Sequence, residues 1–283
     1  MNYAEFIISL EIGLIYGVVA IGIYLTFRVI DFPDLTCDGS FVLGAASSSI
    51  LIKAGCNPWF ALLVALFAGS IAGLITGVLN IRCKITDLLS GILVAFMLYS
   101  INLKVMGGIP NIALIKQVTI FTAHNPLLIL CAICGIIYLL YSYLLVTDFG
   151  LALRSIGQNQ RLALNGGVRV KQMTVIGLML SNSVISLGGA LFSQHQGFAD
   201  VSQGTGTIII GLAAVIIGEK LLPFRTSWAT VLSCLLGSII YRLFIGFALH
   251  SEMLGLETQD LNLITGVMLI GIMVVPRVRR NKC

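Results

Sequence analysis

The sequence predicts an all-α polytopic membrane protein that crosses the bilayer about nine times. Hydrophobic residues make up 58% of the chain and charged residues only 10%, which is typical of integral membrane proteins. Several apolar segments are long enough to cross a hydrocarbon core of roughly 30 Å. All six prolines fall between these segments or at their ends, as expected if the segments are helices.

Nine apolar segments account for the predicted crossings. In order, they are residues 7–27, 38–54, 58–80, 85–101, 126–146, 172–193, 205–219, 226–247 and 261–276. No basic region precedes the first segment and no small-residue cleavage pattern follows it, so we expect it to remain as a helix and not to be removed as a signal peptide. Together the segments predict a single transmembrane domain over residues 1–283.

Glycines recur at the four-residue spacing that lets helix backbones approach each other in a membrane. Gly69, Gly73 and Gly77 form one such row, and Gly13 and Gly17 form another. Lipid offers no hydrophobic drive for helix association, so close packing of this kind has to supply attraction between helices. The rows predict a compact bundle and say nothing about a substrate.

The distribution of basic residues predicts the orientation of the chain. Lys and Arg gather in residues 147–171, in the tail 277–282 and in loops on that same side, whereas Lys53, Lys104 and Lys116 fall on the other side. The positive-inside rule therefore places residues 147–171 and the C-terminus in the cytoplasm and the N-terminus outside. The net charge of +5 reflects this orientation, because the basic residues are too dispersed to indicate nucleic-acid binding.

Residues 147–171 form the one long polar, basic segment of the chain, and we interpret them as a cytoplasmic loop. Asn159 is placed to cap the first turn of a short helix, and Gly166 and Gly167 are placed to end it. Between the caps lies an apolar group, Leu162-Ala163-Leu164. A lone helix of this length is marginal in water, so its apolar side is suited to the groove of a partner protein. An ordinary connector between two membrane helices is the alternative.

The same loop carries a family signature. The pattern Thr147-x-Phe149-Gly150-x-Ala152-x-Arg154, followed by Asn159 and Ala163, resembles the coupling loop of ABC importer permeases of the branched-chain amino acid and ribose group. Further matching blocks lie at residues 28–41, 180–183, 188–200 and 204–219, so the resemblance covers most of the chain. It is nearest to the subgroup whose binding proteins are assigned to aromatic or branched amino acids.

The resemblance implies three protein partners: a cytoplasmic ATP-binding subunit, an extracytoplasmic substrate-binding protein and a second permease copy. It also implies a bacterial inner-membrane location. In this family the short helix of the loop docks on the ATPase. The residues expected to couple to the ATPase are Gly150, Arg154, Asn159, Arg161, Leu162, Ala163, Leu164 and Gly166. We expect Ala163→Arg, or a bulky residue at Gly166, to uncouple ATP hydrolysis from transport.

Two short, glycine-interrupted segments, residues 34–46 and 200–214, are candidates for the translocation pathway. Each opens with an acidic, hydroxyl-rich stretch; the first enters the membrane from inside and the second from outside. This relation is typical of an inverted repeat, which is a hypothesis here, and it places the pathway between the two segments. The candidate pathway residues are Asp34, Thr36, Asp38, Asn182, Gln194, His195, Gln196, Asp200, Thr205 and Thr207.

Each of these polar groups also has a structural interpretation. Gln194, His195 and Gln196 form an outer vestibule or face lipid headgroups. Asn182 and its serine neighbours line a cavity or join helices by hydrogen bonds, and the second role is the commoner one in membrane bundles.

The sequence contains none of the common motifs for hydrolysis. It has no Gly-x-x-x-x-Gly-Lys-Ser/Thr phosphate loop, no His-Glu-x-x-His and no Gly-x-Ser-x-Gly, and it offers no convincing metal cluster. Cys131 and Cys134 have the spacing of a redox pair, but they lie in an apolar helix and are interpreted as structural. We therefore expect no enzymatic activity and no cofactor, with ATP hydrolysis left to a partner subunit.

These observations together predict a permease subunit that imports a small polar solute, most simply an amino acid. The alternative is a secondary transporter that couples to an ion through Glu11, which has no evident partner in the sequence. A passive channel is a third class, and the lack of a repeated ring of charged residues argues against it. The external loops are too short to form a receptor domain, so the choice of solute would reside in a separate protein.

Overall fold

The structure is a computed structural model that describes residues 3–115, 117–122, 125–222, 226–249 and 265–266. The ninth predicted crossing, residues 261–276, lies outside the described residues except for Thr265 and Gly266. The basic tail 277–282 and Lys116 also lie outside them. The described chain folds into ten helices and two short strands.

The helices follow the predicted segments closely. They are α1 (Tyr3–Tyr24, continued by a π-helical turn at Leu25–Ile30), α2 (Thr36–Lys53), α3 (Pro58–Cys83), α4 (Asp87–Val105), α5 (Pro126–Val146), α6 (Asp148–Gln158), α7 (Gln160–Asn165), α8 (Val170–Gln196), α9 (Thr207–Leu221) and α10 (Ser227–Leu249). A 3₁₀ turn, Val201–Gly204, precedes α9. Pro58 and Pro126 each open a helix, where a missing N–H costs nothing.

The predicted all-α fold class is confirmed, and the structure adds one short β-ribbon to it. Strands β1 (Asn111–Ala113) and β2 (Phe198–Asp200) pair antiparallel, with Asn111 opposite Asp200. This ribbon joins the loop after α4 to the end of α8. It satisfies backbone groups that two irregular connections would otherwise leave unpaired.

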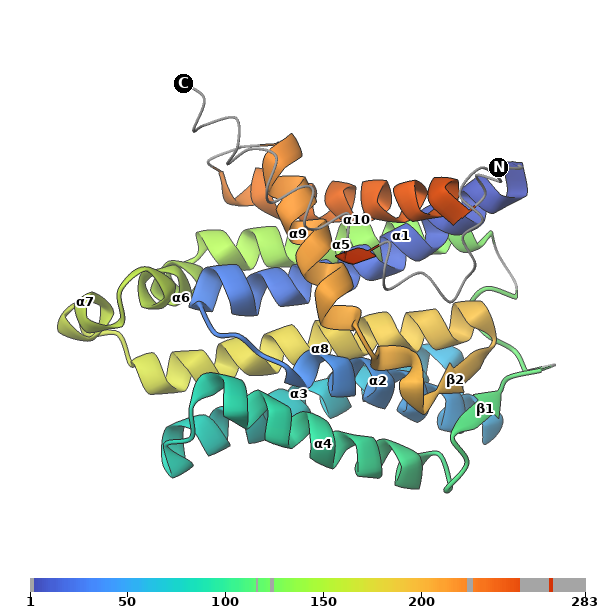
Figure 1. Cartoon of the computed structure of the whole chain (residues 1–283), viewed down its shortest axis with the longest axis horizontal. Coiled ribbons are helices and arrows are strands. Elements are labelled where there is room, and N and C mark those ends of the chain that lie inside the picture. Colours follow the sequence, from blue (N-terminus) through green and yellow to red (C-terminus); the bar gives the residue numbers. More distant parts are fainter. Residues whose placement is uncertain (1–2, 116, 123–124, 223–225, 250–264, 267–283) are drawn as a thin grey trace.

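Among the described residues, seven helical segments are long and apolar enough to cross a membrane: Tyr3–Ile30, Pro58–Cys83, Asp87–Val105, Pro126–Val146, Val170–Gln196, Val201–Leu221 and Ser227–Ala248. The predicted crossing at 38–54 is not among them. It forms α2, which begins near the middle of the bundle and is packed against α3, α4 and α8 (Figure 1). A helix enclosed by other helices can be polar, because its side chains face protein in place of lipid.

The long helices lie side by side, with α6 and α7 at one end and β1, β2 and the first turns of α1 at the other (Figure 1). α1 packs along α10 and α9, while α8 packs along α3 and α2. The segment 31–35 runs back from the α6–α7 end to start α2, and residues 198–206 run inward from the opposite end to start α9. The two short helices thus enter the bundle from opposite sides, as the sequence predicted.

The glycine rows pack where the sequence predicted close helix contacts. A Cβ on Gly73 of α3 would lie 2.3 Å from the Leu178 backbone carbonyl oxygen of α8, and one on Gly69 would lie 2.3 Å from the Asn182 backbone carbonyl oxygen. On α1, a Cβ on Gly13 would lie 3.1 Å from the Ile239 Cα of α10, and one on Gly17 would lie 2.8 Å from a Leu235 side-chain methyl. The backbones of these helix pairs therefore touch, and any side chain at Gly69 or Gly73 would separate α3 from α8.

We expect Gly73→Val to destabilise the bundle, because the added methyl groups have no space between α3 and α8. Overpacking of this kind should lower the melting temperature of the detergent-purified chain by roughly 5 °C or more. Gly135→Ala in α5 is the matched control, since a Cβ there meets nothing within 4 Å. Equal melting temperatures for the two variants would contradict the close packing.

Candidate functional site

Asp34 is fully buried and joins the start of α2 to α8. Its Oδ1 accepts a hydrogen bond from the Thr36 backbone N–H at 2.9 Å, and its Oδ2 accepts one from Asn182 Nδ2 at 2.7 Å. The Asn182 side chain also donates to the Leu178 carbonyl and accepts from the Ser40 hydroxyl at 2.7 Å. Thr36 Oγ1 lies 2.7 Å from Thr76 Oγ1 of α3. Three of the predicted pathway residues, Asp34, Thr36 and Asn182, therefore belong to one network.

Asp38, in the first turn of α2, joins the two short helices. Its Oδ1 accepts from the Ile208 N–H at 3.0 Å and its Oδ2 accepts from the Gly206 N–H at 3.3 Å. These donors lie at the beginning of α9, where backbone N–H groups have no partner within the helix and the helix dipole favours a negative charge. Thr207 is buried there too, and its hydroxyl has no hydrogen-bond partner among the described residues.

A cavity of about 130 Å³ opens beside this junction. Asp38 borders it from α2, Gly204 and Thr205 border it from the turn before α9, and Tyr99 and Asn102 border it from α4. Asn102 Nδ2 donates to the Gly39 carbonyl at 3.1 Å. The sequence reasoning missed Tyr99 and Asn102, although two polar residues three positions apart in an apolar helix were a usable signal.

The remaining predicted residues lie nearer the end that holds β1 and β2. Gln194 is buried, and its Nε2 donates to the Ser48 hydroxyl at 3.0 Å while its Oε1 accepts from the Ile120 N–H at 3.3 Å. Gln196 is partly exposed. Gln194 therefore joins α8 to α2 and to the loop between β1 and α5, and it does not face an open vestibule in this structure.

His195 supplies the partner that Glu11 lacked in the sequence. Its Nε2 lies 2.8 Å from Glu11 Oε2, and both side chains are largely buried. The ring of Phe121 packs edge-on against the imidazole. This contact ties α1 to α8 and could not be seen from residues 184 positions apart.

Asp200 lies at the end of the β1–β2 ribbon, opposite Asn111. Its carboxylate accepts hydrogen bonds from Asn111 Nδ2 at 3.0 Å and from the Ser202 N–H at 2.8 Å. Partial burial raises the pKa of Asp200, but the bonds from Ser202 and Asn111 lower it further, so the net pKa lies below the ordinary value. The carboxylate is therefore ionised at neutral pH and acts as a turn-forming acceptor.

The loop 147–171 contains the predicted capped helix. Asn159 Oδ1 accepts from the N–H groups of Arg161 and Leu162, at 3.0 and 3.2 Å, and so begins α7. Gly167 has a left-handed φ of 82°, and the Val168 N–H bonds back to the Ala163 carbonyl at 3.0 Å. This is the glycine-dependent helix end that the sequence indicated, although the left-handed residue is Gly167 and not Gly166.

The three apolar residues of α7 do not act alike. Leu162 and Leu164 are 69% and 57% exposed, whereas Ala163 is only 3% exposed and packs into the core. An arginine at Ala163 would therefore disturb the loop itself and would not test its outer surface alone. The accessible apolar face of α7 consists of Leu162 and Leu164.

A further helix, α6, which the sequence analysis did not predict, holds the loop against the bundle. Leu153 and Ile156 are buried, and a Cβ on Gly157 would lie 2.2 Å from the Val29 carbonyl of the π-helical turn. Gly150 is equally close to the end of α5, where a Cβ would lie 2.4 Å from the Leu144 carbonyl oxygen. The loop is thus fixed to α1 and α5 and is not a free connector.

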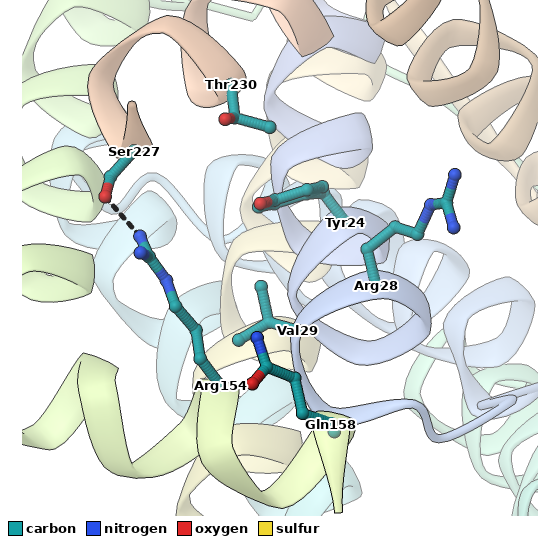
Figure 2. Close-up of a pocket in the computed structure, with 8 residues that line it drawn as sticks. Tyr24, Arg28, Val29, Arg154, Gln158, Ser227 and Thr230 are labelled. Atoms are coloured by element: carbon teal, nitrogen blue, oxygen red, sulfur yellow. Dashed lines mark hydrogen bonds between the residues drawn. The ribbon is translucent and has the colours of Figure 1, made fainter. Parts of the chain in front are cut away.

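Arg154 of α6 reaches across a polar cavity of about 260 Å³ and donates a hydrogen bond to the Ser227 hydroxyl at the start of α10. Figure 2 shows this side chain crossing from α6 to α10, with Tyr24 and Thr230 beside it. Arg28 also borders the cavity, but its guanidinium points away in Figure 2 and pairs with Glu219 of α9. Arg154 therefore links the loop to the bundle.

The comparison with known proteins gives the family. Residues 6–275 match the family described as "Branched-chain amino acid transport system / permease component". The chain belongs to this permease family.

Individual relatives agree with this assignment. The chain is 39% identical over 259 residues to "Tyrosine transport system permease protein" of Clostridioides difficile (strain R20291), covering 91% of this chain and 86% of that protein. It is 33% identical over 270 residues to "Uncharacterized protein RP368" of Rickettsia prowazekii (strain Madrid E), covering 93% and 94%. A more distant relative, at 23% identity over 84% of this chain and 74% of the relative, is "Ribose import permease protein RbsC" of Escherichia coli (strain K12).

The permease is thus the membrane subunit of an ABC importer. Family membership decides against the ion-coupled secondary transporter and the passive channel that the sequence left open. It is a transport subunit and not itself an enzyme. The roles of the individual site residues remain predictions.

We expect Asp38→Ala to destabilise the permease, because the Gly206 and Ile208 N–H groups at the start of α9 would lose their acceptor. The loss should be about 3 kcal/mol, as for a helix cap that is also a charged hydrogen-bond partner. Asp148→Ala in the first turn of α6 is the matched control, since that carboxylate is exposed and makes no cap. Thermal unfolding in detergent measures both, and equal unfolding temperatures would rule out the capping role.

Proposed function

We propose that this permease imports an aromatic amino acid, with tyrosine as the first candidate, across a bacterial inner membrane. The observation that carries this proposal is the 39% identity, over 91% of the chain, to a tyrosine transport permease. The identity to the ribose permease is much lower, at 23%. A cytoplasmic ATP-binding subunit would supply the energy and a separate extracytoplasmic binding protein would deliver the solute.

The proposed orientation puts the α6–α7 end in the cytoplasm. Described basic residues at that end include Arg82, Lys84 and Arg161, whereas Lys53 and Lys104 end α2 and α4 at the opposite end. This asymmetry supports the positive-inside assignment. The N-terminus would then lie outside.

The proposed architecture is an inverted repeat in one transmembrane domain, residues 1–283. The unit α1–α2–α3 would correspond to α8–α9–α10, with the opposite direction through the membrane. Reciprocal packing supports it: the first helix of each unit lies along the last helix of the other, and each short helix packs on the first helix of the other unit.

The solute would pass near the Asp38 junction, between two copies of the chain. There the discontinuous helices α2 and α9 place polar groups and helix ends inside the bundle, which a membrane tolerates only against protein or a water-filled path. The cavity bordered by Asp38, Tyr99, Asn102 and Thr205 supports this location.

Coupling would begin at α7, where Leu162 and Leu164 insert into a groove of the ATPase. Movement of the ATPase would then pass through α6 to α1, by the contact of Gly157 with Val29, and to α10, by Arg154 and Ser227. A rigid path of this kind can bias the bundle between outward-open and inward-open states.

We expect Leu162→Glu with Leu164→Glu to abolish binding of the ATPase and ATP-driven uptake without changing the melting temperature of the permease. Both side chains are exposed, so their replacement removes only docking contacts. Ala163→Arg is the comparison, because it should lower the melting temperature as well. Mass spectrometry of the gently solubilised complex measures the amount of ATPase retained. Full retention in the double variant would contradict the docking role.

We expect ATP-dependent uptake of labelled tyrosine by proteoliposomes that contain the permease, its ATPase and its binding protein. Unlabelled tyrosine should compete, whereas unlabelled ribose should not. ATP-dependent uptake of labelled ribose with none of labelled tyrosine would exclude the amino-acid assignment while leaving the ABC permease assignment intact.

A further inference from the structure

An open apolar groove runs between α3 and α8 toward the α6–α7 end of the bundle. We call it the α3–α8 groove; its volume is about 430 Å³ and its lining includes Leu74, Val78 and Arg82 of α3 and Lys171, Val175 and Met179 of α8. Its surface is mostly apolar except at one mouth, where Arg82 ends α3 and Lys171 begins α8. Both cations are exposed.

The groove follows from the close packing of the two helices. A Cβ on Gly77 would lie 3.1 Å from Val175 Cα, so the backbones meet at the floor and larger side chains on either side form the walls. Leu74 lies eight positions from Arg82, and Met179 lies eight positions from Lys171. Each wall is therefore about 12 Å long, most of the half-thickness of a hydrocarbon core of roughly 30 Å.

The two cations at the mouth have no ion-pair partner in the part of the chain that the structure describes. Neither Arg82 nor Lys171 forms an ion pair there, and no carboxylate lines the groove. Lys171 also borders a neighbouring cavity with Asp31 and Asp87, but it pairs with neither.

A second groove at the same end provides a contrast. It lies between the π-helical turn and α9, has a similar volume of about 390 Å³ and contains two cations, Arg28 and Lys220. Glu219 lines it as well and pairs with Arg28. Charge therefore distinguishes the α3–α8 groove, which has two cations and no anion, from this one.

We propose that the α3–α8 groove binds an anionic phospholipid of the cytoplasmic leaflet, with an acyl chain along its walls and the phosphate at Arg82 and Lys171. The cytoplasmic leaflet rests on the proposed orientation of the chain. A basic mouth above an apolar cleft between membrane helices matches both parts of such a lipid.

Two other occupants fit less well. A second copy of the chain related by a two-fold axis would bring the same patch against itself, so Arg82 and Lys171 would face like charges. The ATPase would have to reach into a cleft whose walls belong to membrane-length helices.

The test is lipid binding by the purified permease alone, with dioleoyl phosphatidylglycerol and dioleoyl phosphatidylcholine as probes. Phosphatidylglycerol should raise the melting temperature more than phosphatidylcholine does. In Arg82→Gln with Lys171→Gln, the half-saturating phosphatidylglycerol concentration should rise roughly five-fold for each cation removed. Lys53→Gln with Lys104→Gln, at the opposite end, is the matched control and should behave as the unmodified chain does.

A second variant tests the apolar part. Val78→Trp should fill the groove and reduce the retention of phosphatidylglycerol during purification, although both cations remain. If the Val78→Trp variant retained as much phosphatidylglycerol as the unmodified chain, lipid binding would depend on surface charge alone, and the proposal would be overturned.

Four other results would also overturn it: equal responses to the two lipids, an equal loss in the control variant, an equal stabilisation by inorganic phosphate, or a disulfide between copies through a cysteine placed at Ile176. The lipid measurements use neither the ATPase nor the solute, so their failure is separate from a failure of the proposed import function.

Discussion

The first N–H groups of a helix that begins inside a bundle need an acceptor, and in this permease Asp38 supplies it to α9. The same carboxylate lies in the first turn of α2, so one side chain positions both short helices. Removing a carboxylate from water is costly unless it is hydrogen-bonded, and here backbone donors provide those bonds to the half-buried Asp38 side chain. The arrangement of the bundle core follows from this contact, because α1 and α8 pack around the two helices that it joins.

Buried polar groups and glycines stabilise the bundle in different ways. Glycine rows bring α3 to α8 and α1 to α10 at backbone contact, where dispersion is strongest. The Asp34–Asn182 network then fixes the register of α2 against α8, since a shift of either helix would leave a buried carboxylate without its donors. Close packing thus supplies the attraction between helices, and the polar network specifies how α2 is placed against α8.

The loop 147–171 is packed firmly against the bundle. Asn159 and Gly167 set the length of α7, while α6 holds it against α1, α5 and α10. A displacement of Leu162 and Leu164 would therefore be transmitted directly to the helices that surround the Asp38 junction. Close backbone contacts at Gly150 and Gly157 make this connection stiff, because neither can be displaced without a clash.

The sequence by itself determined the membrane class, the positions of the long helices and the capped helix at residues 160–165, because hydropathy, proline positions and capping residues act locally. It also located both discontinuous segments, since glycine and acidic residues interrupt their hydropathy. Tertiary structure alone decided that α2 is enclosed, that Glu11 meets His195, that Ala163 is buried beside exposed leucines and that Tyr99 and Asn102 border the cavity beside Asp38. These facts depend on which helix faces which. The pairing of helix faces depends on contacts between residues far apart in the chain, and local sequence patterns do not reveal those contacts.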